Sequence, residues 1–272
     1  MKLSVLTVNW NTSEHLRKCL NSIDERLPDI QHEIIVVDNG SDDGSPDMVR
    51  SRHPDVLLIG NGENRGFAAA CNQAAARARG EFLLLLNPDI VLEPGAVQEL
   101  LKFADERPDA AVAPLLALPG NGLQLGPGGL FASTKTAFNH YSLLSRLFPG
   151  VFRGIWLRPG GLRRAKQLDW LSGACLLIRR PHFDSAGGFD ESFFMYAEDM
   201  DLCHRLSEKG ARFYLLPVRV IHDHGAAFRS SGSPEYCMDA LYNYFIKHHG
   251  GRAARRAMLY AWLGLSARAV IL

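Results

Sequence analysis

The stretch Phe82-Leu-Leu-Leu-Leu-Asn-Pro-Asp89 (FLLLLNPD) predicts the fold class of this chain. Its first five residues are all apolar, which is typical of a β-strand buried on both faces of a sheet. Asn87-Pro88 then ends the strand, because proline has no N–H for the ladder of hydrogen bonds. The acid Asp89 is therefore expected at the carboxyl end of a central strand.

Four further segments of this kind occur in the first half of the chain and alternate with segments of helical periodicity. An alternation of buried strands and amphipathic helices predicts an α/β domain whose mostly parallel central sheet is flanked by helices. Helices are expected after Thr12 or Ser13, over 46–50 and 67–79, and from Pro94 onward. The further strands are expected at residues 3–8, 32–37, 56–59 and 110–116.

The composition excludes several classes of protein. The 30 Lys and Arg residues balance 29 Asp and Glu residues, whereas a general nucleic-acid-binding protein needs a basic face, so no nucleic-acid partner is expected. The five Cys residues include no CxxC pair and are interpreted as thiols of a reducing cytoplasm, buried where they lie among apolar neighbours. The first ten residues do not resemble a signal peptide, and no apolar run reaches the roughly 18 residues of a membrane span.

Polar residues follow three of the predicted strands, and parallel strands bring their carboxyl ends to one edge of a sheet, where ligands bind. Asn9, Asp38 and Asp89 hold these positions. Asp38 could accept a hydrogen bond from a ribose hydroxyl or a pyrimidine imide, although the run DNGSDDGS also suits a simple turn. Asp89 offers the oxygen ligand that hard divalent cations prefer. Neither a Gly-rich dinucleotide turn after residue 8 nor a P-loop is present.

Two more polar motifs each have a functional and a structural interpretation. Asn64-Arg65-Gly66 precedes an Ala-rich segment, so a helix N-terminus and Arg65 could face a diphosphate, or the glycine could serve close packing alone. His222-Asp223-His224 follows an expected strand, and one of its imidazoles could complete a metal site while the other lies at the surface. Structural zinc is not expected, because no Cys or His partner has the required spacing.

The segment FFMYAEDMDLCHRL (193–206) places three acids at the start of an expected helix. Asp199 has the helical spacing of the apolar stripe, whereas Glu198 and Asp201 are expected on the other face, with Asp201 paired to Arg205. An acid at this place can complement the helix dipole. A carboxylate that faces a cleft and is partly desolvated instead suits a general base.

The second half of the chain is less regular. Residues 118–168 are rich in Gly, Pro and Arg and are too long for an ordinary connection, so they are interpreted as a partly mobile functional insertion. Residues 168–178 (LDWLSGACLLI) predict one strand, and two more are expected at 212–215 and 219–222. A helix is expected at 235–249.

In their order and spacing these motifs resemble glycosyltransferase family 2, above all its rhamnosyltransferase-like members. The likeness covers about residues 3–225. It is carried by VNWN (8–11), VVDNGSDDGS (36–45), ENRGFAAACN (63–72), LLLLNPD (83–89) and GGFDESFFMYAEDMDLCHR (187–205). The resemblance implies the GT-A fold, and inverting transfer of a sugar from a nucleoside diphosphate sugar to an acceptor hydroxyl with Mg²⁺ or Mn²⁺.

The resemblance also implies roles for individual residues. Asp38 would bind the base of the donor, Asp199 would be the catalytic base, and Glu198 would shape the catalytic site with it. The nucleotide sugar as a whole would contact Val8, Asn9, Asp38, Asn64, Arg65, Gly66, Asn87, Ser172 and Gly173.

The metal site implied by the resemblance departs from the pattern of the family. Asp89 stands at the last position of the DxD-type motif, but Asn87 replaces its first Asp, which leaves fewer carboxylates for the metal. The metal-binding histidine of the family falls in the H-D-H run. His222 is preferred because it follows the strand directly, and His224 is the alternative.

The resemblance further implies a donor and an acceptor. The donor is expected to be dTDP-rhamnose. The acceptor is expected to be a growing, lipid-linked glycan of a bacterial surface polysaccharide such as O-antigen or cell wall. One or a few sugars would be added, because the QxxRW motif and the membrane spans of processive members are absent. A UDP- or GDP-sugar donor and a nucleotide-sugar-binding protein without catalysis are the alternatives. A nucleotidyltransferase would need a Gly-rich triphosphate loop that the first turn lacks.

Four parts of the chain are expected. They are a nucleotide-sugar-binding half (1–117), the insertion (118–168) and an acceptor and catalytic half (169–230), which together form the catalytic domain (1–230), and a helical segment (231–272).

The helical segment has two open interpretations. Arg252, Arg255 and Arg256 precede AMLYAWLGLSA (257–267), which is too short to span a bilayer. A basic collar beside an apolar helix fits peripheral attachment of a cytoplasmic enzyme to an anionic inner membrane surface. A last core helix or a contact between subunits fits the same residues.

Overall fold

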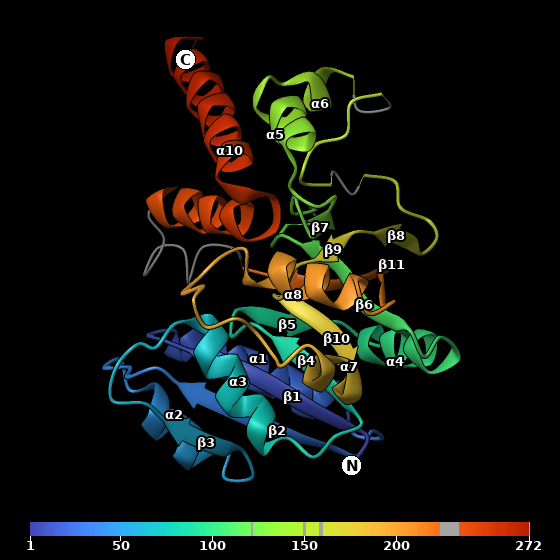
Figure 1. The fold of residues 1–272 in the computed structure, drawn as a ribbon. Helices are drawn as coiled ribbons and strands as arrows, with labels where there is room; N and C mark the ends of the chain where they lie inside the picture. Colours follow the sequence, from blue (N-terminus) through green and yellow to red (C-terminus); the bar gives the residue numbers. More distant parts are fainter. Residues whose placement is uncertain (121, 149–150, 158–159, 224–233, 272) are drawn as a thin grey trace.

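The structure, a computed structural model, describes the chain except residues 121, 149–150, 158–159, 224–233 and 272. Within the described residues, a nine-stranded sheet has the order β3-β2-β1-β4-β10-β6-β11-β5, with β8 paired to β11 (Figure 1). Its strands are β1 (Leu3–Asn9), β2 (His32–Asp38), β3 (Leu57–Gly60), β4 (Phe82–Leu86), β5 (Ile90–Leu92), β6 (Ala110–Ala117), β8 (Lys166–Leu168), β10 (Cys175–Arg179) and β11 (Arg212–His222).

The sheet is parallel in its first half and mixed in its second. Strands β3, β2, β1 and β4 run parallel, whereas β10 is antiparallel to both β4 and β6. Beyond β10, β11 runs parallel to β6 and antiparallel to β5 and β8. The predicted α/β architecture, a mostly parallel sheet flanked by helices, is confirmed.

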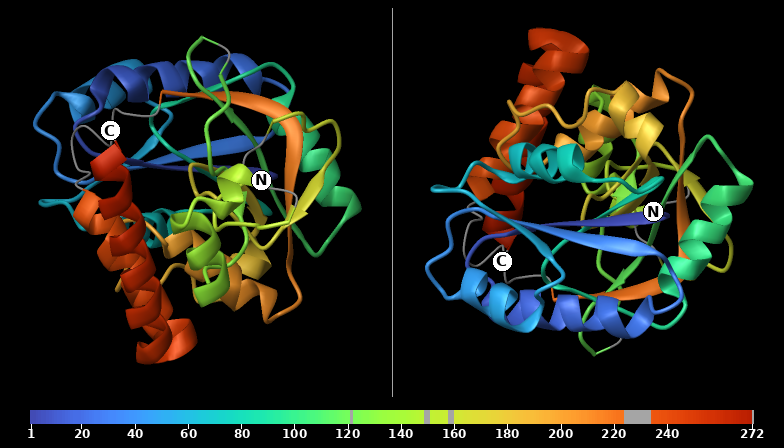
Figure 2. Two further views of the ribbon diagram at one scale, coloured as in Figure 1. Left: turned by 90° about the horizontal axis from the view of Figure 1, so that it is seen from above. Right: turned by 90° about the horizontal axis from the view of Figure 1, so that it is seen from below.

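Helices cover both faces of the sheet. Figure 2 shows α1 and α2 on one face and α3, α7 and α8 on the other. The helices are α1 (Ser13–Arg26), α2 (Ser45–Arg52), α3 (Phe67–Arg77), α4 (Ala96–Glu106), α5 (Thr134–Tyr141), α6 (Leu144–Leu147), α7 (Arg180–Ser185), α8 (Glu198–Ser207) and α10 (Pro234–Ile271).

Strand β4 joins the two halves of the core. Leu83 and Leu85 pack with the layer of α3 and α8, whereas Leu84 and Leu86 pack with the layer of α1 and α4. Successive side chains of a strand point to opposite faces, so a strand between two helical layers must be apolar at every position. This is why FLLLL, without alternation, marks a central strand.

Several element boundaries differ from the prediction. Residues 168–178 contain the end of β8 and two further strands, β9 (Trp170–Leu171) and β10, because a bend at Asp169 and a turn at residues 173–174 interrupt the expected strand. The two strands expected at 212–222 are one strand, β11, with an irregular register between Leu216 and Arg219. Helix α4 begins at Ala96 after Gly95 in the left-handed region, so Pro94 precedes the helix rather than opening it.

The insertion contains regular structure. It carries α5, α6 and the short strand β7 (Gly128–Gly129), which pairs with β9. A Cβ at Gly129 would overlap the carbonyl oxygen of Ile155, so the loop after α6 folds back tightly onto β7. This contact holds α5 and α6 over the carboxyl edge of the sheet.

Helix α10 consists of two parts that meet at Gly250, whose φ of 77° lies in the left-handed region. Its first part packs near α8, and its second part rises beside α5, away from the sheet (Figure 1). No helix in the described part of the chain has an apolar run that could cross a bilayer.

Asp201 holds α8 and α10 together, which corrects the expectation that it is an ordinary acid on the outer face of its helix. Its side chain is fully buried. Oδ2 accepts a hydrogen bond from Nε of Arg205 at 2.8 Å, as predicted, but Oδ1 accepts from Nζ of Lys247 at 2.6 Å and faces Nε2 of His248 at 2.8 Å. Burial by itself raises the pKa of Asp201, but the hydrogen bonds from His248, Lys247 and Arg205 outweigh it and hold this pKa well below its usual range.

We predict that Asp201→Asn lowers the free energy of unfolding by about 3 kcal/mol, because it removes the buried negative charge that Arg205, Lys247 and His248 surround. Urea denaturation at pH 7 measures this change. The control is Asp47→Asn on α2, where an exposed acid pairs with Arg50 and little loss is expected. Equal, small effects of the two substitutions would contradict the role of Asp201.

Candidate functional site

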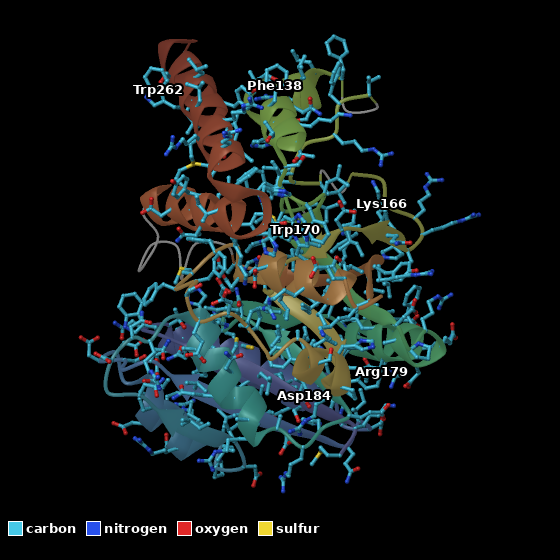
Figure 3. All side chains as sticks on the ribbon, viewed as in Figure 1. Phe138, Lys166, Trp170, Arg179, Asp184 and Trp262 are labelled. Carbon is cyan, nitrogen blue, oxygen red and sulfur yellow. The ribbon has the colours of Figure 1, made fainter. Side chains whose placement is uncertain are left out.

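A cavity of about 430 Å³ lies at the carboxyl edge of the sheet. On its sheet side it is lined by polar residues that follow β1, β2 and β4 and by the N-terminal residues of α8. On its other side it is lined by aromatic and apolar residues of the insertion and of α10. Trp170, which also lines the cavity, is labelled in Figure 3 between the sheet with α8 on one side and α5 with α10 on the other. The cavity can therefore receive a ligand with a charged, polar end and a less polar end.

Asp38 is buried at the end of β2, beneath the residues that line the cavity, and its carboxylate fixes the turn that follows the strand. Its Oδ2 accepts hydrogen bonds from Nδ2 of Asn9 and Oγ of Ser41, both at 2.7 Å, and its Oδ1 accepts from the backbone N–H of Ser41 at 2.9 Å. Asp38 and Asn9 are both buried. The next residue, Asn39, lines the cavity and donates to Oδ1 of Asn64 at 3.2 Å. The carboxylate thus fixes the turn that presents Asn39.

Gly66 serves close packing, which is the structural interpretation of the Asn64-Arg65-Gly66 motif. It has φ of 83°, and a Cβ there would lie 2.5 Å from the carbonyl oxygen of Phe194. The same oxygen accepts the first N–H of α3, from Phe67, at 2.9 Å. The N-terminus of α3 is therefore covered in part by the segment that leads into α8.

Asp89 and His222 face each other across the carboxyl ends of β4 and β11. Both are buried, and Nε2 of His222 lies 3.1 Å from Oδ1 of Asp89, yet this oxygen has no hydrogen-bond partner among the described residues. Nδ1 of His222 lies 2.6 Å from Oε1 of Gln124. If Nδ1 donates to that oxygen, a neutral imidazole directs the lone pair of Nε2 at the carboxylate.

This pair of atoms fits a divalent cation. A lone pair and a carboxylate oxygen that face each other in a buried place repel unless a proton or a cation lies between them. Imidazole nitrogen and carboxylate oxygen are ligands for Mn²⁺, and diphosphate oxygens and water complete such sites. In the described part of the chain, no three His, Cys, Asp or Glu side chains gather as a metal site. The ligand itself would therefore supply much of the coordination shell.

The start of α8 directs two acids at the cavity. Tyr196 and Ala197 have φ of 68° and 62°, an uncommon conformation for residues with a side chain. Asp199 then accepts a hydrogen bond at Oδ2 from the backbone N–H of Gly173 at 3.0 Å and lines the cavity. Burial raises the pKa of Asp199, although the N–H groups of Gly173 and Met200 lower it in part. A raised pKa and a place in the cavity suit a group that accepts a proton.

Glu198 is buried, which corrects its expected place on the outer face of α8. Its Oε2 has no hydrogen-bond partner among the described residues. Burial raises the pKa of Glu198 well above the ordinary 4.5, and the charge of neighbouring Asp199 raises it further. Burial and the charge of Asp199 thus both favour the protonated form of the Glu198 carboxyl group.

The structure brings most of the predicted site residues to one cavity. Asn9, Asp38, Arg65 and Gly66 lie outside its lining, and His224 lies outside the described residues. The lining residues that the sequence predicted are Val8, Asn64, Asn87, Asp89, Ser172, Gly173, Glu198, Asp199 and His222.

The sequence did not identify the apolar wall of the cavity. Its aromatic members include Trp10, Tyr141, Trp156 and Trp170, and α10 adds Met238 and Leu241. Trp156 and Trp170, on either side of the Arg-rich and Gly-rich part of the insertion, are the sequence signal that could have identified this wall, since aromatic faces bind sugars and apolar groups. The part played by α10 depends on tertiary packing and has no local signal.

Comparison with known proteins places the chain in a family. The family model "Glycosyl transferase family 2" matches residues 4–181. An N-acetylglucosaminyl-diphospho-decaprenol L-rhamnosyltransferase of Mycobacterium tuberculosis is 31% identical over 237 residues, which are 81% of this chain and 75% of that protein.

Solved structures share the fold at low sequence identity. A structure of GalNAc-T7 with UDP, GalNAc and Mn²⁺ has a TM-score of 0.67 and is 15% identical, over 90% of this chain and 47% of that one. A mannosyltransferase of Pyrobaculum calidifontis in complex with GDP-Man and Mn²⁺ has a TM-score of 0.59 and is 20% identical, over 99% of this chain and 75% of that one. The fold is therefore the expected GT-A fold.

We predict that Glu198→Gln stabilises the protein at pH 7, by about 1–3 kcal/mol, and not at pH 4. The raised pKa of Glu198 means that the folded state keeps a proton that the unfolded state releases above about 4.5. Glu198 therefore contributes its full stabilisation only below about pH 4.5, and the free energy of unfolding falls as pH rises from there through the raised pKa. Glutamine does not titrate, so the variant does not lose stability in this way.

Urea denaturation of both proteins at pH 4, 5.5 and 7 tests this prediction. Glu208→Gln, at an exposed acid after the end of the same helix, is the matched control and is expected to leave the pH dependence unchanged. A stability difference between Glu198→Gln and the wild type that does not vary with pH would show that Glu198 is an ordinary acid.

Proposed function

Because the chain belongs to glycosyltransferase family 2, we propose that this glycosyltransferase moves rhamnose, with inversion, from dTDP-rhamnose to a hydroxyl group of a lipid-linked bacterial surface glycan. The observation that carries the proposal is the carboxylate of Asp199, which has a raised pKa and lies in a cavity with a polar and an apolar side. The relative from M. tuberculosis is named as a rhamnosyltransferase that acts on N-acetylglucosaminyl-diphospho-decaprenol, and this supports the donor and the class of acceptor.

Asp199 would act as the base in a direct displacement. Its carboxylate takes the proton of the acceptor hydroxyl while that oxygen attacks the anomeric carbon of the donor. The bond between this carbon and the diphosphate oxygen breaks on the opposite face, so the configuration inverts and the nucleoside diphosphate leaves. The N–H of Gly173 holds the carboxylate in a fixed direction at 3.0 Å. One carboxylate is sufficient, unlike the paired acids of glycosidases.

Glu198 would support this base. Burial and the charge of Asp199 raise the pKa of Glu198 and so favour its neutral form, which would leave the negative charge of the pair on Asp199. It also lines the cavity, where it would limit the space open to the acceptor.

Asp89 and His222 would hold Mg²⁺ or Mn²⁺, which is the use that the unpartnered Oδ1 of Asp89 supports. When bound, the cation supplies positive charge next to the diphosphate of the donor. Asn87, also in the lining, adds a neutral oxygen where a second carboxylate would bind more strongly. His224 is the alternative ligand.

The nucleotide would lie over the ends of β1 and β2. Val8, Asn39 and Asn64 line this part of the cavity. The buried Asp38 and Asn9 would act on the base through the turn that they hold, which presents Asn39. Arg65, exposed before α3, would reach the diphosphate, and Ser172 and Gly173 would contact the sugar. In this proposal residues 1–117 bind the donor, 169–230 carry the base, and the insertion and α10 enclose the acceptor.

We predict that Asp199→Asn lowers the rate of transfer by about 10²-fold or more and changes the affinity for the donor no more than fewfold, because an amide cannot accept the proton. The rate of the wild type is expected to fall as pH drops through the raised pKa of Asp199. Transfer from radiolabelled donor and isothermal calorimetry measure the two quantities, with Glu208→Gln as the control. Near-normal turnover of Asp199→Asn would show that Asp199 is not the catalytic base.

Donor identity and metal dependence are tested together by thermal shift. Among dTDP-rhamnose, UDP-sugars and GDP-sugars, dTDP-rhamnose with Mn²⁺ is expected to raise the melting temperature most, since a ligand stabilises the state that binds it. Asp89→Asn is expected to lose the Mn²⁺-dependent part of this shift, whereas Asn87→Asp, which adds a carboxylate, is expected to strengthen it. A greater shift with a UDP- or GDP-sugar would show that this sugar nucleotide, and not dTDP-rhamnose, is the donor. An unchanged Mn²⁺-dependent shift in Asp89→Asn would show that Asp89 does not hold the metal.

A further inference from the structure

The second part of α10 has its small side chains inside and its large apolar side chains outside. Ala254, Ala257 and Ala261 are fully buried, and a Cβ at Gly264 would lie 2.3 Å from the carbonyl oxygen of Tyr141 in α5. On the outside, Leu259, Trp262 and Leu263 are each at least half exposed. A surface helix of a globular protein ordinarily buries its large apolar side chains. The exposed ones in α10 therefore lack an explanation in the packing of this chain.

A single outward stripe of this helix joins basic and apolar residues. Arg252, Arg255 and Arg256 are exposed, and Leu259, Trp262 and Leu263 follow them at helical spacing. The stripe thus changes from cationic to apolar along α10, toward the end that is farthest from the sheet (Figure 1). Trp262 points outward at this end in Figure 3.

Helix α6 and the residues after it add a second exposed apolar group. Leu147, Phe148 and Val151 are 65%, 58% and 78% exposed, between the exposed Arg146 and Arg153. These values decide that the group is on the surface rather than at the edge of the core. Figures 1 and 2 show α5, α6 and the second part of α10 together at one end of the molecule.

Helices α5 and α10 are packed as one unit. The rings of Phe138 and Tyr260 meet edge to face at 5.2 Å, and Gly264 allows the backbone of α10 to approach Tyr141. Nearer to the sheet, Tyr141 on α5 and Met238 on α10 line the apolar side of the cavity. The same pair of helices therefore connects the exposed apolar groups to the cavity.

Two segments of the chain, which include α5, α6 and most of α10, differ in charge from the rest. Residues 110–168 and 240–272 contain twelve of the 30 Lys and Arg residues and none of the 29 Asp and Glu residues. A chain of net charge +1 is thus composed of one part of +12 and another of −11. A bilayer with anionic lipids attracts such a basic part and accepts apolar side chains at the same time.

We propose that α6 with the residues after it and the outer stripe of α10 form a two-part docking surface for an anionic lipid bilayer. A polyanion would not favour exposed Leu, Val and Trp side chains. A second copy of the chain would bring two strongly basic surfaces together. Docking directs the apolar side of the cavity toward the bilayer, and only this last point rests on the proposed lipid-linked acceptor.

Co-sedimentation of the full-length protein with vesicles tests the surface. Vesicles of phosphatidylcholine with 30% phosphatidylglycerol, roughly the proportion at which cationic residues favour binding, are compared with phosphatidylcholine alone. The wild type is expected to bind the anionic vesicles about tenfold more strongly, and less so in high salt. Equal binding to both vesicles, or no binding to either, would overturn the proposal.

Two double variants separate the two parts of the surface. Leu147→Ser with Val151→Ser, and Trp262→Ser with Leu263→Ser, are each expected to weaken binding roughly tenfold or more, because both groups insert. Leu57→Ser, an exposed apolar residue on β3, is the matched control and is expected to bind like the wild type. Normal binding of the first double variant would leave α10 alone as the anchor and overturn the two-part surface.

Two further measurements exclude other occupants and other causes. Circular dichroism confirms that the variants are folded, and sedimentation velocity without lipid gives the mass. A dimer that both double variants dissociate, without vesicle binding by the wild type, would assign the surface to a second copy, and binding to heparin alone would assign it to a polyanion. Transfer to a short-chain, water-soluble acceptor is expected to persist in both variants. Its absence in the wild type would refute the proposed function and leave the docking result unaffected.

Discussion

The buried carboxylate of Asp201 is the interaction on which the arrangement of the site depends. It accepts hydrogen bonds from Arg205 of its own helix and from Lys247 of α10, and His248 lies within hydrogen-bond distance. A buried charge needs such partners, so α8 and the first part of α10 must keep their relative positions. Because α8 carries the acids of the site and α10 contributes Met238 and Leu241 to the cavity wall, one ion cluster fixes both sides of the cavity.

Three acids within four residues of one another have opposite electrostatic surroundings. Hydrogen bonds from cationic side chains lower the pKa of Asp201, whereas burial raises the pKa of Glu198 and of Asp199. Only Asp199 combines a raised pKa with a fixed orientation toward the cavity, through the N–H of Gly173. Sequence proximity therefore does not decide the role of an acid; the charges that tertiary packing brings to it do.

The strands and their polar ends could be predicted from the sequence because each depends on local pattern. The run FLLLL allows only a strand between two layers, and Asp89 must then lie at its end. The surroundings of Asp201 could not be predicted, because Lys247 and His248 follow it by more than 40 residues. The apolar wall of the cavity has the same origin, since Tyr141 and Leu241 line one cavity only after the insertion folds back onto β7.

The division of charge along the chain follows the division of tasks in the proposed enzyme. Residues 110–168 and 240–272 carry an excess of bases and no Asp or Glu, and the rest of the chain, which includes most of the sheet and the start of α10, carries the excess of acids. In the proposed enzyme a donor with a diphosphate would bind at the junction, where Asp89 and His222 would offer the ligands for a cation that offsets the local negative charge. An acceptor with a lipid end would enter from the basic, apolar side. Opposite ends of the cavity would then select two chemically different substrates, and the transfer would take place where the two surroundings meet, at Asp199.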